Sequence, residues 1–166
     1  MRRKPEYDAT VEMGIPVTLI DAAIEHDDGS VEIPNLDTLL STVAVARALD
    51  PGQLVGAEIR FLRHVLDLTG SEFAAEIDLS NKSVVSRWEN DRVRPGGYTE
   101  KVIRQLVLNL LGMHAPGIEI GANAIPGMKI RPRSVSEGPL RISLRLVKGR
   151  DETGEGQSRE CYAAAA

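Results

Sequence analysis

Apolar residues recur at the spacing of an α-helix through the middle of the chain, from about residue 35 to residue 111. Turn-forming residues interrupt the pattern, as at Asp50, Pro51 and Gly52. Candidate N-caps precede several of the apolar runs, among them Thr69 and Asn81. The pattern therefore predicts five helices, over about residues 35–49, 55–66, 72–77, 82–90 and 99–111.

The two ends of the chain have a different pattern. Residues 17–24 and 30–33 favour strands, and Asp27, Asp28 and Gly29 between them indicate a β-hairpin. A further short strand is possible within residues 7–12. Residues 113–139 are punctuated by Pro and Gly, and residues 141–148 alternate as a half-buried strand does.

These elements predict a mainly α fold: a bundle of about five helices with a small N-terminal β-hairpin and a C-terminal strand. We expect an N-terminal hairpin region over 1–34 and a helical domain over 35–112. A Pro/Gly-rich extension with one strand would follow over 113–148, and a disordered tail over 149–166.

Charge is distributed unevenly along the chain, although the net charge is only −4. Residues 1–55 carry four Lys/Arg against ten Asp/Glu, whereas residues 81–104 carry six against three. The cations thus concentrate around the helix predicted over 82–90. An acidic first half with a basic segment of this kind is compatible with DNA binding.

Several classes of protein are disfavoured. The single cysteine, Cys161, gives no disulfide within the chain and no Cys-rich zinc site. No signal peptide and no apolar run of about 20 residues is evident, so we expect a cytoplasmic protein. The chain offers no nucleophile elbow, phosphate-binding glycine loop or metal-ligand cluster. We therefore expect no enzymatic activity and no cofactor.

The stretch from Lys82 to Asn90 has the mixed chemistry of a DNA-reading helix. Val85 and Trp88 would share one helix face, and the neighbouring faces would show Ser and cationic side chains. Hydroxyls bond base edges or phosphates, and Arg can pair with guanine through two hydrogen bonds. An ordinary amphipathic surface helix is the alternative from these residues alone.

The neighbouring helices favour the first interpretation. A short helix, a tight turn and a second short helix, braced by longer helices on both sides, form a helix-turn-helix DNA-binding domain. Ala74 is small where the two motif helices would cross. Leu79 and Val85 would fill the angle between them, and Phe73 and Trp88 would form the floor.

Residues 58–63, 68–74 and 86–90 resemble the phage-repressor (Cro-like, XRE) helix-turn-helix family. More narrowly, they are similar to its branch in MqsA-type antitoxins, which join a small N-terminal β-containing domain to such a module. The hairpin region followed by residues 33–37 is also similar to that branch. The resemblance covers roughly residues 7–112 and is most specific over 58–90.

The resemblance implies an ion pair between Arg63 and Glu89, joining the helix before the motif to the end of the recognition helix; two surface charges that never meet are the alternative. The chain departs from the family in two ways. It lacks N-terminal zinc-binding cysteines, so zinc is not carried over. It also has one extra residue between Ala74 and Trp88, which we place in the turn around residues 79–81.

The candidate DNA-binding residues fall into three groups, and a solvated surface role is the alternative for each. Base readers are expected on the second motif helix, which Asn81 would cap. Phosphate contacts are expected at the start of the first motif helix and in the loop after the second. The second motif helix contributes Asn81, Lys82, Ser83, Ser86 and Arg87. The start of the first motif helix contributes Thr69, Gly70 and Ser71, and the loop contributes Arg92 and Arg94.

The leading hypothesis is a transcriptional repressor that binds double-stranded DNA at a palindromic operator as a homodimer. The resemblance further implies the autorepressing antitoxin of a type II toxin–antitoxin pair, with a cognate toxin as protein partner. A repressor without a toxin, or an interaction module that no longer binds DNA, are alternatives. We expect the dimer contact on the apolar helix over 102–111, helped by an unpaired edge of the strand over 141–148.

Overall fold

The computed structural model describes residues 1–149 and 159–165. Its helical part follows the sequence pattern closely. Five helices form where apolar spacing predicted them, and they pack around a mainly aliphatic core that includes Phe73 and Trp88. They are α2 (Leu36–Leu49), α3 (Gly56–Val65), α4 (Gly70–Glu76), α5 (Lys82–Glu89) and α6 (Gly97–Leu111), and the 3-10 helix η1 (Gly112–His114) extends α6.

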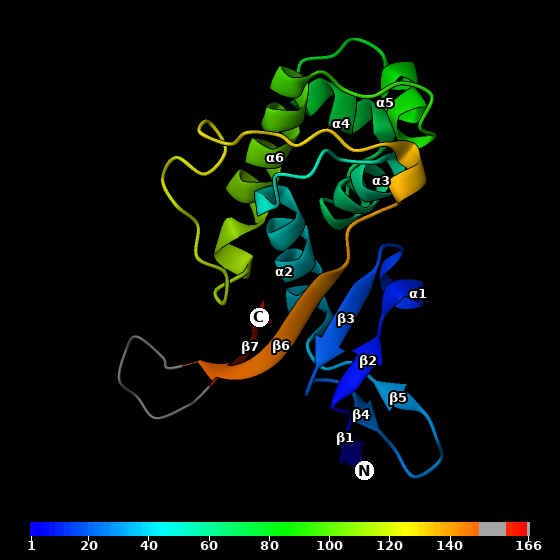
Figure 1. Cartoon of the computed structure of the whole chain (residues 1–166), viewed down its shortest axis with the longest axis vertical. Coiled ribbons are helices and arrows are strands. Elements are labelled where there is room, and N and C mark those ends of the chain that lie inside the picture. The colour runs from blue at the N-terminus through cyan, green and yellow to red at the C-terminus, as the bar shows by residue number, and fades with distance from the viewer. Residues whose placement is uncertain (150–158, 166) are drawn as a thin grey trace.

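The expected fold class is wrong, because the described residues contain two β-sheets rather than a lone hairpin (Figure 1). The smaller sheet has the strand order β1–β4–β5 and the larger has β2–β3–β6–β7. The molecule is therefore mixed α/β. The strands are β1 (Arg2–Arg3), β2 (Glu6–Asp8), β3 (Val17–Ile20), β4 (Ile24–Glu25), β5 (Val31–Glu32), β6 (Ile142–Gly149) and β7 (Arg159–Ala164).

The predicted hairpin is also wrong in its pairing. The turn at residues 27–29 joins β4 to β5, but β3 leaves that sheet and pairs with β2 and β6. Asp21, in the left-handed backbone region at φ 50°, follows β3 and breaks the continuous strand that we expected over 17–24. The short helix α1 (Thr10–Met13) occupies part of the segment for which we considered a strand.

The two ends of the chain share the larger sheet. β3 pairs in parallel with β6, joining Val17 to Ile142, and β6 pairs antiparallel with β7. Residues 159–164, which we expected within a disordered tail, thus form a strand; the rest of that tail, except Gly149 and Ala165, lies outside the described residues. β6 has a neighbour on each side, so the unpaired edge that we expected for dimerisation is not there.

The extension between α6 and β6 runs back along the helices. Figure 1 shows it leaving the far end of α6, crossing in front of the helical part and reaching the 3-10 helix η2 (Val135–Glu137) before it enters β6. Parallel bridges attach it at two points, between Gly52 and Arg131 and between Gly117 and Ala163. The described residues contain no helix that is both long and apolar enough to cross a membrane.

Candidate nucleic-acid interface

Each motif helix begins at a side-chain cap. The Thr69 hydroxyl accepts a hydrogen bond from the Glu72 amide at 3.2 Å, and the Glu72 carboxylate accepts one from the Thr69 amide at 3.2 Å. This reciprocal capping box fixes the start of α4. Asn81 Oδ1 accepts from the Ser83 amide at 2.9 Å and fixes the start of α5. The Thr69 and Asn81 side chains are therefore already engaged in capping.

The turn between the motif helices contains Asp78 in the left-handed region at φ 60°. The Asp78 amide donates to Ala75 O at 3.1 Å, and the Leu79 amide donates to Ala74 O at 2.8 Å. These bonds close the end of α4 and redirect the chain toward Asn81. The Leu79 side chain is half-buried and packs against the core.

The side chains expected beneath the motif form its core. Phe73 and Val85 are fully buried, and Ala74 and Trp88 are nearly so. Trp88 thus belongs to the core of the helical part, as we expected, and is not available as a surface for base stacking. Because these apolar groups lie on one side of α5, they determine which side of the helix faces outward.

The outward side of α5 carries the expected base readers. Lys82, Ser83, Ser86 and Arg87 are all exposed. Within the described residues, the side chains of Lys82, Ser83 and Arg87 make no hydrogen bond or ion pair, whereas Ser86 meets Asn90 Nδ2 at 3.4 Å. Three of the four are therefore free to bind a ligand.

An ion pair fixes the far end of α5 on α3. Arg63 Nε donates to Glu89 Oε1 at 3.0 Å, and the second contact, from Nη2, is 2.9 Å. The Glu89 side chain is only 7% exposed, so this pair is shielded from water. Arg60 approaches the same oxygen at the longer distance of 3.8 Å. The pair that the resemblance implied is thus formed.

Close backbone contact adds a second attachment between α5 and α3. A Cβ atom on Gly56 would lie 2.4 Å from Glu89 O, so only glycine fits at this position. The Gly56 amide donates to Asp91 Oδ1 at 2.7 Å. The end of α5 is therefore attached to α3 at two points: the ion pair of Arg63 near the end of α3, and the hydrogen bond and close backbone contact of Gly56 at its start.

The expected phosphate contacts are only partly available. Ser71 and Arg92 are exposed. Gly70 lies close to Lys82, because a Cβ atom added to Gly70 would be 3.9 Å from the Cβ atom of Lys82. The start of α4 and the start of α5 therefore converge. Arg94 differs, because it is half-buried and donates to Gln53 Oε1 at 2.7 Å. It belongs to an internal polar network rather than to the exposed loop.

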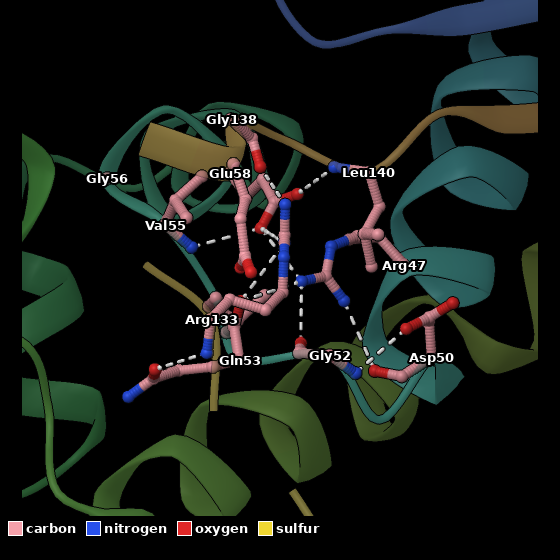
Figure 2. A network of polar contacts seen from close by, with 12 residues as sticks. Arg47, Asp50, Gly52, Gln53, Val55, Gly56, Glu58, Arg133, Gly138 and Leu140 are labelled. Atoms are coloured by element: carbon pink, nitrogen blue, oxygen red, sulfur yellow. Dashed lines mark hydrogen bonds and ion pairs between the residues drawn. The ribbon is translucent and has the colours of Figure 1, made fainter. Parts of the chain in front are cut away.

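Figure 2 shows the part of that network around Arg47, Glu58 and Arg133, which we did not predict as a site. Arg47 and Glu58 are both fully buried and joined at 2.8 Å. Arg104, also fully buried, pairs with Glu100 at 2.7 Å, and its Nη2 also donates to Gly52 O at 2.8 Å. Burial lowers the pKa of Arg104, and the bond to Glu100 opposes that shift.

The network fixes the loop between α2 and α3 and attaches the extension to it. Glu58 also accepts from the amides of Val55, at 3.0 Å, and Leu140, at 3.2 Å. Arg133 Nη1 donates to Gln53 O at 3.2 Å. One signal in the sequence could have indicated this buried network. Arg47 lies on the apolar stripe of α2, where a cation requires buried partners.

No protein-family model, no curated protein and no solved structure matches this chain. Among the described residues there is no group of three or more His, Cys, Asp and Glu side chains that could hold a metal ion.

Proposed function

We propose that this protein is a sequence-specific regulator that binds double-stranded DNA and inserts α5 into the major groove. One observation carries the proposal: α5 presents Lys82, Ser83, Ser86 and Arg87 outward on a helix whose orientation is fixed from behind. A rigid helix with short hydroxyls and long cations matches the major groove in width and in hydrogen-bonding groups. Ser71, Gly70 and Arg92 would add phosphate contacts at the edges of the groove.

Repression of an operator would follow if two copies bind together. One motif makes few contacts, and a dimer would place two recognition helices about 34 Å apart, one turn of duplex. With β6 paired on both sides, the far end of α6 remains the candidate contact, because Leu110 and Met113 are 48% and 96% exposed there. The cytoplasmic location expected from the sequence is part of this proposal.

The test is binding of the full chain to the DNA upstream of its own gene, measured by fluorescence anisotropy at several salt concentrations. We expect Arg87→Ala to weaken specific binding by roughly 5- to 150-fold and to relax specificity, as loss of one base contact does. Lys129→Ala is the matched control, since Lys129 is an exposed cation on the extension. Equal binding by Arg87→Ala, or binding without salt dependence, would contradict the proposal.

A protein partner is the second part of the proposal. Residues 1–55 have ten carboxylates against four cations, and several of the carboxylates, including Glu6 and Asp28, are exposed. An acidic surface of this kind suits a basic protein such as a toxin encoded beside this chain. Co-purification with the product of the adjacent reading frame tests it. A regulator without a toxin would retain DNA binding but capture no such product.

A further inference from the structure

A groove of about 280 Å³ lies between α1 and α3 and is distinct from the DNA-reading side of α5. One wall is a single face of α3, formed by residues 57, 60, 61, 64 and 65, which follow the i, i+3, i+4 spacing. The opposite side is formed by residues 12–14 and by Leu40 of α2. This face of α3 is therefore open, whereas Arg63 on the same helix is engaged with α5.

The floor and rim of the groove differ in character. Met13, Leu40, Phe61 and Val65 give it an apolar floor. The rim holds one cation and one anion from opposite sides, Arg60 of α3 and Glu12 of α1. His64, which is exposed, is the remaining titratable group on the lining.

Arg60 is only loosely held. Its guanidinium contacts Glu89 at 3.8 Å and Asn90 at 3.5 Å, both longer than a good hydrogen bond, and its side chain is 49% exposed. The neighbouring Arg63 already satisfies Glu89 at 2.9 Å. A carboxylate arriving in the groove could therefore take Arg60 into a short charge-assisted bond without leaving Glu89 unpaired.

We propose that this groove binds a free apolar α-amino acid, such as leucine or phenylalanine. Its carboxylate would pair with Arg60, its ammonium group with Glu12, and its side chain would lie on Met13, Leu40 and Phe61. Charge complementarity favours this occupant. A simple carboxylate has no group that matches the charge of Glu12, which within the described residues only accepts a hydrogen bond from the Tyr7 hydroxyl, and a simple amine has none that matches the charge of Arg60. The volume lies just below the range typical of drug-sized ligand pockets, which suits a ligand of few atoms.

The groove is connected to the proposed DNA site through Arg60. Because Arg60 reaches Glu89 and Asn90 at the end of α5, drawing it into the groove removes one cation that helps to hold that end. Ligand binding should then lower DNA affinity. This consequence rests on the proposed DNA-binding function, whereas the binding of the amino acid does not.

The first experiment titrates the full chain with L-leucine by calorimetry, in the absence of DNA. Two matched compounds each lack one charged group: 4-methylpentanoate has no ammonium and 3-methylbutylamine has no carboxylate. We expect saturable leucine binding with a dissociation constant of about 1 mM or tighter, and at least tenfold weaker binding of both analogues. Equal binding of either analogue, or no saturation by leucine and by phenylalanine, overturns the proposal.

Variants locate the site. Arg60→Gln and Glu12→Gln should each weaken leucine binding at least tenfold. Lys129→Gln, which changes an exposed cation outside the groove, should leave it unchanged. Both groove residues are exposed, so neither substitution is expected to prevent folding, and a thermal melt of each variant checks this. Leucine binding that survives Arg60→Gln overturns the assignment to this groove.

The coupling is measured separately, as DNA affinity with and without saturating leucine. We expect a severalfold loss of affinity in the natural protein and no effect of leucine on Arg60→Gln. Unchanged affinity in the natural protein would overturn the coupling alone. Absence of any DNA binding would refute the proposed function and leave the calorimetric result standing.

Discussion

At the scale of single residues, three aspartates end successive helices in the same unusual conformation. Asp67, Asp78 and Asp91 follow α3, α4 and α5 with φ values of 56°, 60° and 54°. The left-handed region costs an ordinary residue about 1–2 kcal/mol, and Asp tolerates it better than most. Within the described part of the chain, only Asp91 has a compensating side-chain contact, because its carboxylate accepts from the Gly56 amide at 2.7 Å.

This difference gives a prediction that uses the same substitution at two sites. Asp78→Gly relieves the backbone cost and removes a negative charge from the end of α4, so we expect the free energy of unfolding to stay equal or to rise by up to about 1 kcal/mol. Asp91→Gly also removes the acceptor of the Gly56 amide and should be about 1–3 kcal/mol less stable than Asp78→Gly. Urea unfolding measures both, and equal stability of the two variants would contradict the role given to Asp91.

At the scale of elements, α3 fixes the far end of α5, whereas the turn after α4 and the Asn81 cap fix its start. Arg63 holds Glu89, and the backbone of α3 begins against that of α5 at Gly56. A shielded ion pair of this kind fixes geometry more than it adds net stability, because both charges lose water on folding. Removing one partner is costly, since it leaves the other without its counter-charge.

We therefore expect Arg63→Ala to lower both the melting temperature and DNA affinity. Breaking a buried pair costs about 3–5 kcal/mol, and Arg60 at 3.8 Å can partly replace the lost cation, so the lower end of that range is expected. In the double variant Arg63→Ala, Glu89→Ala the loss should be smaller than the sum of the two single losses. Additive losses in chemical unfolding would show that the two charges do not act together.

The helices could be predicted from the sequence, whereas the pairing of the strands could not. Helices α2–α6 have local signals, such as the Thr69–Glu72 capping box and the apolar positions that repeat with the helical period. The sheets have few local signals. β1 has only two residues, and β3 pairs with β6, which lies more than 120 positions away along the chain. The exposed side of α5 followed from the placement of Val85 and Trp88. The sequence could not show that Arg94 joins an internal network, because its partner Gln53 is 41 residues away along the chain.

At the scale of the whole molecule, buried polar contacts connect the helical part to the returning chain. The buried Glu58 of α3 accepts from the Leu140 amide just before β6. Within the same sheet, the Tyr162 hydroxyl of β7 donates to Pro34 O at 2.7 Å. A Cβ on Gly117 would lie 2.0 Å from Tyr162 O, so the extension also passes directly against β7. The strand near the end of the chain thus supports the start of α2.

Tyr162 should make this connection sensitive to alkaline pH. The side chain is fully buried, and burial, reinforced by the charge of Glu160, raises the pKa of its hydroxyl to about 12. In the unfolded chain the pKa is about 10. The folded state therefore holds the proton more tightly, so its contribution to stability is fully present below pH 10 and is lost as the pH rises from 10 to 12. The loss from this group should reach about 2–3 kcal/mol, since each pKa unit corresponds to about 1.4 kcal/mol.

Tyr162→Phe separates this effect from other alkaline titrations. At neutral pH the variant should be about 1–3 kcal/mol less stable, because Pro34 O loses its donor. Between pH 10 and 12 its free energy of unfolding should fall less steeply than that of the natural protein, so the two curves converge. Tyr98→Phe is the control: Tyr98 is 83% exposed, and its removal should leave the slope unchanged. Parallel curves for Tyr162→Phe and the natural protein would mean that the buried hydroxyl does not resist ionisation. Equal stability at neutral pH would mean that its bond to Pro34 O does not stabilise the fold.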